Sequence, residues 1–225
     1  MSVATANGLR RTLTPGAVVV AVGTLLFVNL SDQRSARGQS ASEAVVRVEE
    51  DWELVLNDPN SSMDAPQFHT MMSAFNSCDQ SYAQVLWNYR ETPEYAAGGV
   101  QLQSYSGESK LSTRSMEFRK LNTSAETITW TQSLSTDGKT LSFEVSDGQS
   151  NTWGVFGKDM RLDDSADLSD LGGYSSEFST KQSGVTYGSN RVDKLVIKEV
   201  RRYGASGLLS VDSTPKVVFE LNASN

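Results

Sequence analysis

Cysteine and histidine each occur only once in this chain of 225 residues. The single cysteine, Cys78, excludes an intramolecular disulfide and any zinc site that needs several cysteines. The single histidine, His69, removes the usual zinc constellations and leaves one possible imidazole base. We therefore expect Cys78 to be a free thiol and His69 to have a surface or hydrogen-bonded role.

The apolar run near the N-terminus, residues 17–28, is shorter than the roughly 20 apolar residues of a full membrane span. Arg10 and Arg11 precede this run, and no acidic residue comes before Asp32. Basic residues followed by an apolar stretch are typical of an export signal. The arginine pair also predicts that the N-terminus stays in the cytoplasm and that the rest of the chain lies outside.

The N-terminal segment is either a cleaved signal or an uncleaved anchor. A cleavage site of small residues just after Val28 is poorly formed, which favours the anchor. We therefore expect residues 1–30 to form one hydrophobic helix that contacts the membrane through residues 15–30. The rest of the chain is then membrane-anchored or, after cleavage, secreted, in the periplasm or at the cell surface.

A polar linker separates this segment from the folded part. Residues 31–42 are small and polar without apolar periodicity, which predicts a flexible tether. The folded domain is then expected at residues 43–225. It holds 16 basic and 26 acidic residues, so its net charge is about −10. Such a charge argues against nucleic acid or an anionic lipid surface as the partner of the domain.

Residues 128–157 give the strongest structural signal. Asp137-Gly138 favours the positive φ values of a tight hairpin loop, and alternating residues flank it on both sides. Both strands then agree on which face is apolar. A second turn is expected at Asp147-Gly148, followed by an aromatic strand. The pairs expected across the hairpin are Leu134 with Leu141, Gln132 with Phe143, and Trp130 with Val145.

The whole domain shows strand signals and almost no helix. Short alternating segments are separated by Gly, Asp, Asn and Ser turns, which indicates a β-sandwich or a barrel. The expected strands are residues 44–57, 82–90, 98–106, 126–135, 139–146, 152–156, 191–203 and 216–221.

The hairpin resembles the strand–turn–strand unit of concanavalin-like and laminin-G-like jelly-roll sandwiches. The resemblance implies an all-β domain of two packed antiparallel sheets, here a jelly-roll sandwich preceded by the N-terminal hydrophobic helix. One sheet of such folds is often concave and used for sugars or proteins. The fold hosts lectins, glycosidases and adhesion modules, so the fold alone does not select a function. The residues that carry the resemblance are Trp130, Asp137-Gly138, Leu141, Phe143, Val145 and Asp147-Gly148.

Glu49, Asp51 and Glu53 alternate along a predicted strand and therefore share one face. Their E-x-D-x-E spacing resembles the catalytic strand of laminarinase-type glycoside hydrolases, which implies Glu49 as nucleophile, Asp51 as helper and Glu53 as acid/base. The same alternation fits a solvated face, which we favour, because apolar residues fill the other parity. Glu50 falls on that apolar parity and predicts a bulge or a local polar partner.

Gln101, Gln103 and Tyr105 lie on one face of another predicted strand. Amide side chains bind sugar hydroxyls, and aromatic faces stack on the apolar side of a pyranose ring. We therefore expect these three residues to bind ligand. Tryptophans can also provide sugar platforms, but three of them are expected in the core: Trp87, Trp130 and Trp153.

An acidic cluster lies at Asp163, Asp164, Asp167 and Asp170. Calcium takes six to eight oxygen ligands, so calcium binding is an alternative for this loop. The spacing does not fit the helix–loop–helix calcium signature, and we favour a solvated loop without a cofactor.

Together these patterns predict an exported, membrane-tethered β-sandwich that acts as a non-catalytic binding module, with carbohydrate as the leading ligand. One alternative is a laminarinase-type glycoside hydrolase that uses Glu49, Asp51 and Glu53. A second alternative is an envelope structural or protein-interaction subunit, whose sheet edge or face packs on another envelope protein.

Overall fold

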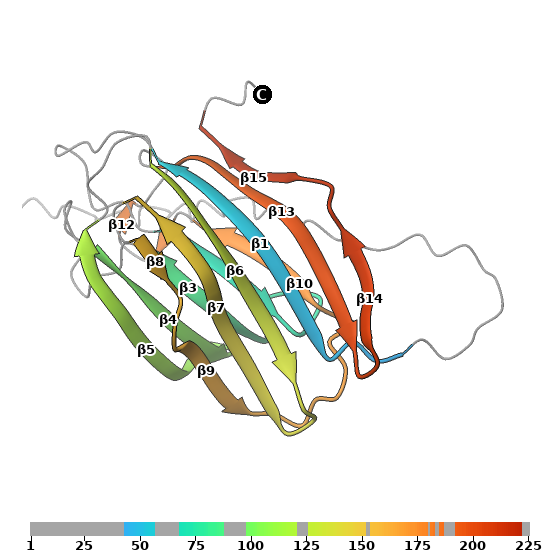
Figure 1. Cartoon of the computed structure of the whole chain (residues 1–225). Coiled ribbons are helices and arrows are strands. Elements are labelled where there is room, and N and C mark those ends of the chain that lie inside the picture. Colours follow the sequence, from blue (N-terminus) through green and yellow to red (C-terminus); the bar gives the residue numbers. More distant parts are fainter. Residues whose placement is uncertain are drawn as a thin grey trace, which may run out of the picture.

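A computed structural model describes residues 43–56, 68–87, 98–120, 126–151, 154–179, 181–182, 185–186 and 192–221. These residues form two antiparallel sheets that pack face to face, together with a small two-stranded ribbon (Figure 1). Within these ranges no helix is long and apolar enough to cross a membrane. The expected N-terminal helix, its membrane segment at residues 15–30 and the linker at residues 31–42 lie outside the described residues.

The larger sheet has eight strands and contains both the first and the last strands of the fold. Its order is β14-β13-β1-β6-β7-β8, while β15 also pairs with β13 and β9 also pairs with β7. The strands are β1 (Arg47–Leu56), β6 (Thr127–Thr136), β7 (Thr140–Ser150), β8 (Gly154–Phe156), β9 (Met160–Ser165), β13 (Val192–Gly204), β14 (Gly207–Asp212) and β15 (Lys216–Glu220).

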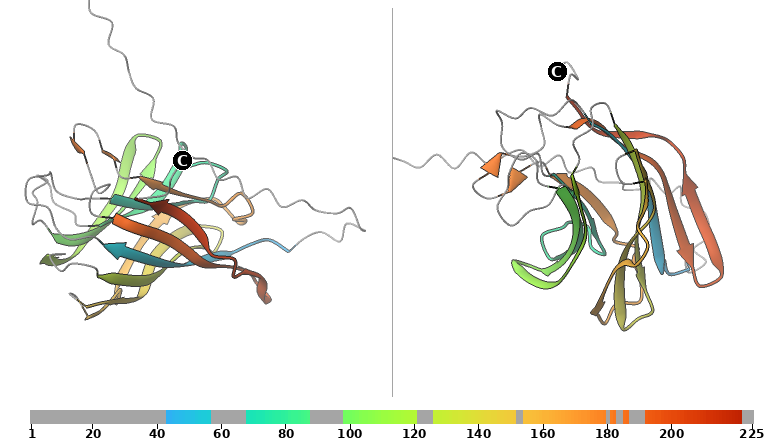
Figure 2. Two further views of the ribbon diagram at one scale, coloured as in Figure 1. Left: turned by 90° about the horizontal axis from the view of Figure 1, so that it is seen from above. Right: turned by 60° about the vertical axis from the view of Figure 1, so that its left-hand side comes forward.

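The smaller sheet has five strands in the order β10-β2-β3-β4-β5. It packs against one face of the larger sheet, and the two layers are seen side by side in the right panel of Figure 2. Its strands are β2 (Phe68–Ser73), β3 (Ser81–Trp87), β4 (Gly98–Ser106), β5 (Ser109–Lys120) and β10 (Ser175–Ser179), and the separate ribbon is β11 (Lys181–Gln182) with β12 (Val185–Thr186).

Each expected strand overlaps an observed strand, with limits that differ by up to four residues where the structure describes them, and the predicted limits of β4 are those observed. Strands β2, β5, β9, β10 and β14 and the ribbon were not predicted. The reason for β2 is visible in its burial, because all six residues are buried and no alternation marks the strand. The reason for β14 is the opposite, because all six of its residues are exposed.

The register predicted for the central hairpin is wrong by two residues. Leu134 pairs with Phe143, and Thr136 pairs with Leu141, so the loop is four residues long. The Asp137 carboxylate holds this loop by accepting hydrogen bonds from the backbone N–H of Lys139 at 2.9 Å and of Thr140 at 2.7 Å. A shift of two residues keeps every side chain on its face, so the predicted apolar face is still correct.

The second turn expected at Asp147-Gly148 is also wrong. Both residues lie inside β7, where the ladder to β6 shifts register and Asp147 has a φ of 52°. This geometry is that of a β-bulge, and an Asp-Gly pair suits a bulge as well as it suits a turn. Gly148 is needed because the ring of Phe156 on β8 lies where a side chain would start.

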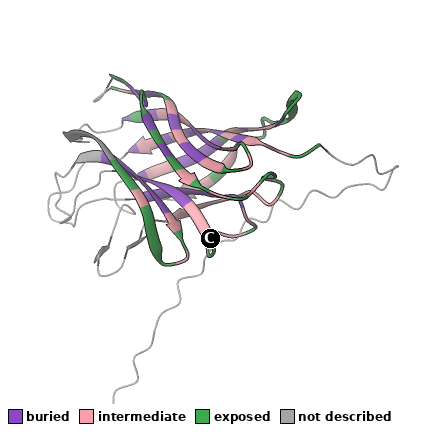
Figure 3. Cartoon of the chain, turned by 90° about the horizontal axis from the view of Figure 1, so that it is seen from below, coloured by how far each residue is buried: buried purple, intermediate pink, exposed green. Residues whose placement is uncertain are grey.

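The core fills the space between the two sheets. Trp52 stacks on Trp130 with ring centroids 5.7 Å apart, and Trp87 from the other sheet meets Trp130 at 4.2 Å. The core positions predicted for Trp87 and Trp130 are confirmed, whereas Trp153 lies outside the described residues. Figure 3 shows the buried residues along the middle of the strands and the exposed ones toward hairpins and edges.

Candidate functional site

The five-stranded sheet turns one parity of its strands toward the core and the other away from the larger sheet. On β3 and β4, Val85 and Leu102 belong to the buried cluster between the sheets. Their neighbours on the opposite parity therefore form the outer face of the sheet. The register sets Gln84 opposite Gln103 and Tyr82 opposite Tyr105 on that face.

Three glutamines on this outer face, which we call the amide row, are Gln84, Gln101 and Gln103. Gln84 Nε2 donates to Gln103 Oε1 at 2.9 Å, and Tyr105 Oη donates to the same oxygen at 2.7 Å. Gln103 Nε2 in turn donates to Gln101 Oε1. The structure thus brings together the three residues predicted to bind ligand, Gln101, Gln103 and Tyr105, while their binding itself stays a prediction.

The amide row ends at a pair of stacked tyrosines. The rings of Tyr82 and Tyr105 lie 4.9 Å apart, with 11° between their planes. Both tyrosines are half-buried, whereas the three glutamines of the row are buried. The tyrosine pair is therefore the more accessible end of the site. Sequence reasoning missed Gln84 and Tyr82, although both lie on the polar parity of a strand that was predicted.

His69 and Cys78 border this face without forming a catalytic pair. Burial lowers the pKa of His69 to about 4, although a hydrogen bond with Gln84 opposes the shift, so the imidazole is neutral at pH 7. Burial and the neighbouring Glu177 carboxylate raise the pKa of the Cys78 thiol. The predicted hydrogen-bonded role of His69 and the free thiol of Cys78 are both confirmed.

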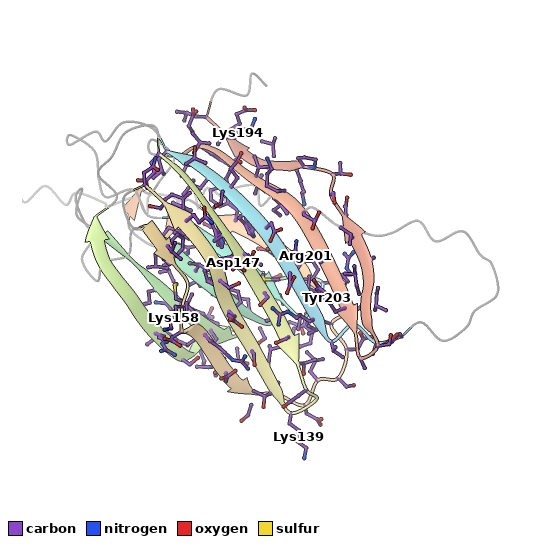
Figure 4. All side chains as sticks on the ribbon, viewed as in Figure 1. Lys139, Asp147, Lys158, Lys194, Arg201 and Tyr203 are labelled. Atoms are coloured by element: carbon purple, nitrogen blue, oxygen red, sulfur yellow. The ribbon has the colours of Figure 1, made fainter. Side chains whose placement is uncertain are left out.

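The outer face of the larger sheet is ionic instead. Arg201 Nε donates to Glu49 Oε2 at 2.8 Å, and Arg201 donates to both Asp51 oxygens at 2.6 and 2.8 Å. Arg201 also pairs with Glu199 at 2.7 Å. Figure 4 shows Arg201 and Tyr203 on β13, and β13 pairs with β1. We call the group of Glu49, Asp51, Glu199 and Arg201 the ionic row.

The ionic row keeps its carboxylates charged. Partial burial raises the pKa of Glu49 and Asp51, but hydrogen bonds from Arg201 outweigh this effect and leave both pKa values below their usual range. The third predicted catalytic residue, Glu53, lies 3.5 Å from the Lys198 ammonium. These contacts favour ion pairing over the protonated acid and free nucleophile that a retaining glycosidase needs.

Glu50 has the polar partners that the sequence predicted, inside the core. Its carboxylate accepts hydrogen bonds from Trp52 Nε1 at 2.9 Å, from Gln132 Nε2 at 2.7 Å and from Tyr174 Oη. Burial raises the pKa of Glu50, and these donors, with Ser176, oppose the shift. Removal of the carboxylate would therefore leave these buried donors without their acceptor.

The Glu50 network joins the two sheets. Gln132 on β6 accepts a hydrogen bond from Thr70 on β2 at 2.9 Å, and Thr70 accepts one from Trp87 on β3 at 3.3 Å. Polar contacts in the core are directional, so they define how the layers sit on each other. Glu50 is therefore part of the scaffold that positions the outer faces.

Two of the four aspartates considered for calcium bind other groups. Asp163 accepts from Ser142 at 2.6 Å and from Arg161 at 2.8 Å. Asp170 accepts from the backbone N–H of Val45 at 2.9 Å. In the described ranges no three His, Cys, Asp or Glu side chains are grouped closely enough to hold a metal ion. The structure thus does not bring Asp163, Asp164, Asp167 and Asp170 together as ligands.

Comparison with known proteins adds no relative to this geometry. No protein-family model matches the chain, and no curated protein matches it either.

Proposed function

We propose that this protein is an exported, membrane-tethered β-sandwich of the concanavalin-like jelly-roll class that binds carbohydrate without catalysis. The observation that carries the proposal is the amide row beside the Tyr82–Tyr105 pair, on a face that does not pack against the other sheet. The export pattern at Arg10, Arg11 and residues 17–28 supports the extracytoplasmic address.

The chemistry of this face suits a neutral glycan. Each glutamine carries two N–H donors and an acceptor oxygen, which match hydroxyl groups that both donate and accept. The tyrosine rings offer apolar faces for a pyranose ring. None of the five side chains, Tyr82, Gln84, Gln101, Gln103 and Tyr105, is charged at pH 7.

The hydrolase alternative has less support. Its expected nucleophile and helper, Glu49 and Asp51, are bound by Arg201 in the ionic row. A lowered pKa suits a carboxylate nucleophile, but Arg201 binds Oε2 of Glu49 and Arg47 pairs with Oε1 at 2.7 Å, so both oxygens that could attack are occupied. We therefore propose a binding function and no catalytic step.

Retention of the purified full-length chain on resins that carry neutral polysaccharides tests this function. The double variant Gln101→Ala/Gln103→Ala should lose retention on any resin that holds the wild type, because the row loses two of its three amides. The matched control is Gln149→Ala, which removes an exposed amide from β7 of the other sheet and should be retained.

A folded double variant with unchanged retention would remove the amide row as the site. Folding is checked by comparing melting temperatures and circular dichroism spectra. If wild type is held by no neutral polysaccharide but by a charged one, the neutral-glycan proposal is wrong.

A further inference from the structure

Strand β14 leaves one edge of the eight-stranded sheet exposed. All six of its residues are exposed, and Leu208, Leu209 and Val211 expose 55%, 39% and 47% of their surface. Among the described strands β14 pairs with β13 alone, so its other side presents unpaired backbone N–H and C=O groups. Such an edge is a template for an additional strand.

The register gathers apolar side chains on one side of this edge. Leu208 lies opposite Tyr203, and Val211 lies opposite Arg201. Tyr203 and Arg201 both contact Glu49 on the outer face, so Leu208 and Val211 point to that face as well. Leu208 and Val211 therefore lie on one side of the edge strand, where an added strand could contact both.

The edge lacks the side chains that usually prevent strand addition. Residues 205–211 contain no charged residue and no proline, and the first proline after them is Pro215. Exposed edges in monomeric proteins usually carry lysine, proline or an inward-pointing charge. A register shift between Arg202 and Tyr203 increases the local twist but leaves the neighbouring edge accessible.

Acidic groups stand at both ends of the uncharged residues 205–211. At the start, Glu43 accepts hydrogen bonds from Ser206 N at 2.8 Å and Ser206 Oγ at 2.6 Å. At the end, Asp212 accepts a hydrogen bond from Thr214 N at 3.0 Å. These hydrogen bonds lower the pKa of Glu43 and of Asp212, so both are ionised at pH 7.

This charge pattern indicates which kind of strand can pair with the free edge of β14. A second copy paired antiparallel through β14 would bring the Glu43 end of one copy to the Asp212 end of the other, and like charges would meet. The whole chain is acidic as well, with a formal net charge of −7. A strand with basic ends would meet opposite charge at both ends.

We propose that β14 is a docking edge for an extended segment of a partner protein, apolar in its middle and with Lys or Arg at both ends. Backbone hydrogen bonds to the free edge supply the main attraction, Leu208 and Val211 contact the apolar middle, and Glu43 and Asp212 pair with the ends. This surface belongs to a different sheet from the amide row, so the proposal is independent of the glycan site.

Fluorescence anisotropy of labelled peptides with the full-length chain tests the proposal. The probes are nine-residue peptides with the same Val-Thr-Val-Thr-Val centre and two Lys, two Ser or two Glu at each end. The Lys-ended peptide should bind at least about tenfold more tightly than the Glu-ended one, and added salt should reduce this difference. Equal binding of the two would overturn the proposal.

Two sets of variants separate the apolar and the charged contributions. Leu208→Lys/Val211→Lys should weaken binding of the Ser-ended peptide by at least about tenfold, while Leu111→Lys on β5, where Leu111 is 53% exposed, is the matched control. Glu43→Gln/Asp212→Asn should remove the preference for Lys ends and keep binding of the Ser-ended peptide.

Folded variants that bind as the wild type does would overturn the docking edge. Analytical ultracentrifugation of the chain alone tests whether a second copy occupies β14 instead. A dimer of the wild type that becomes monomeric in Leu208→Lys/Val211→Lys would show this and would also overturn the proposal. Glycan retention should be unchanged in the β14 variants, which distinguishes this test from that of the amide row.

Discussion

The two outer faces of the sandwich satisfy their polar side chains in different ways. On the larger sheet, Arg201 forms ion pairs with the carboxylates of Glu49, Asp51 and Glu199. On the smaller sheet, the amide row is neutral and hydrogen-bonded within itself and to Tyr105. The ionic row is held by charged groups, whereas the amide row is held by hydrogen bonds between neutral groups.

The two faces therefore respond differently to salt and pH. Ion pairs at a half-exposed surface respond to salt and acid. The side chains of a neutral row respond to neither. The alternating carboxylates of β1 were the more conspicuous pattern in the sequence, but in the fold they form ion pairs with cations of β13.

The largest loss of stability is expected on substitution of Glu50, whose hydrogen-bond network joins the two sheets and so supports both outer faces. Glu50→Ala should lower the free energy of unfolding by about 3–5 kcal/mol, because it leaves buried donors of Trp52, Gln132 and Tyr174 without an acceptor. Urea unfolding at pH 7 measures this change. Glu53→Ala, on the outer face of the same strand, is the control and should cost less than about 1 kcal/mol.

The next effect is the pH dependence of stability, in which His69 and the ionic row act over different pH ranges. His69 has a folded-state pKa lowered from 6.5 to about 4, so below pH 6.5 the unfolded chain takes up a proton that the folded chain does not. Stability is therefore full above about pH 6.5 and falls by up to about 3 kcal/mol as the pH approaches 4. The lowered carboxylate pKa values of Glu49 and Asp51 add a loss only at still lower pH.

Thermal unfolding as a function of pH checks this assignment. His69→Gln should flatten the dependence between pH 6.5 and 4 and keep the loss at lower pH. An equally steep dependence in the variant would show that His69 is not responsible.

A smaller effect is expected from the cation of the ionic row. Arg201→Met should destabilise by about 1–3 kcal/mol, because three carboxylates lose their shared partner. The loss should shrink as salt is added, since screening weakens the repulsion that remains. Urea unfolding at low and high salt measures both, and a loss that does not depend on salt would contradict the electrostatic explanation.

The smallest effect is expected at the ion pair between Lys198 of β13 and Glu53 of β1. Lys198→Ala should change stability by less than about 0.5 kcal/mol, because its pair with Glu53 is long and half-exposed. A change above about 1 kcal/mol would show that Glu53 belongs energetically to the ionic row.

Much of the fold could be predicted from alternation. The parity of β1, β4 and the β6–β7 hairpin gave the correct inner and outer faces. The hairpin register could not be predicted, because loops of two and of four residues at Asp137-Gly138 place the same side chains on the inner face. The loop length depends on the Asp137 carboxylate, which binds two backbone N–H groups.

The candidate site was only half visible in the sequence. Gln101, Gln103 and Tyr105 share a strand, so their common face follows from spacing alone. Gln84 and Tyr82 join them through the β3–β4 register, and Arg201 joins Glu49 across 152 residues. Contacts between strands distant in the sequence depend on topology, which alternation within one strand does not encode.

The position of β1 has a consequence for how this chain is made. The first strand lies between β6 and β13, so the larger sheet cannot close until residues near 200 have left the ribosome. Contacts of such long sequence separation slow folding and leave β1 with one open edge during synthesis. Pairing of β13 with β1 is therefore the step that closes the larger sheet, and it comes late in synthesis.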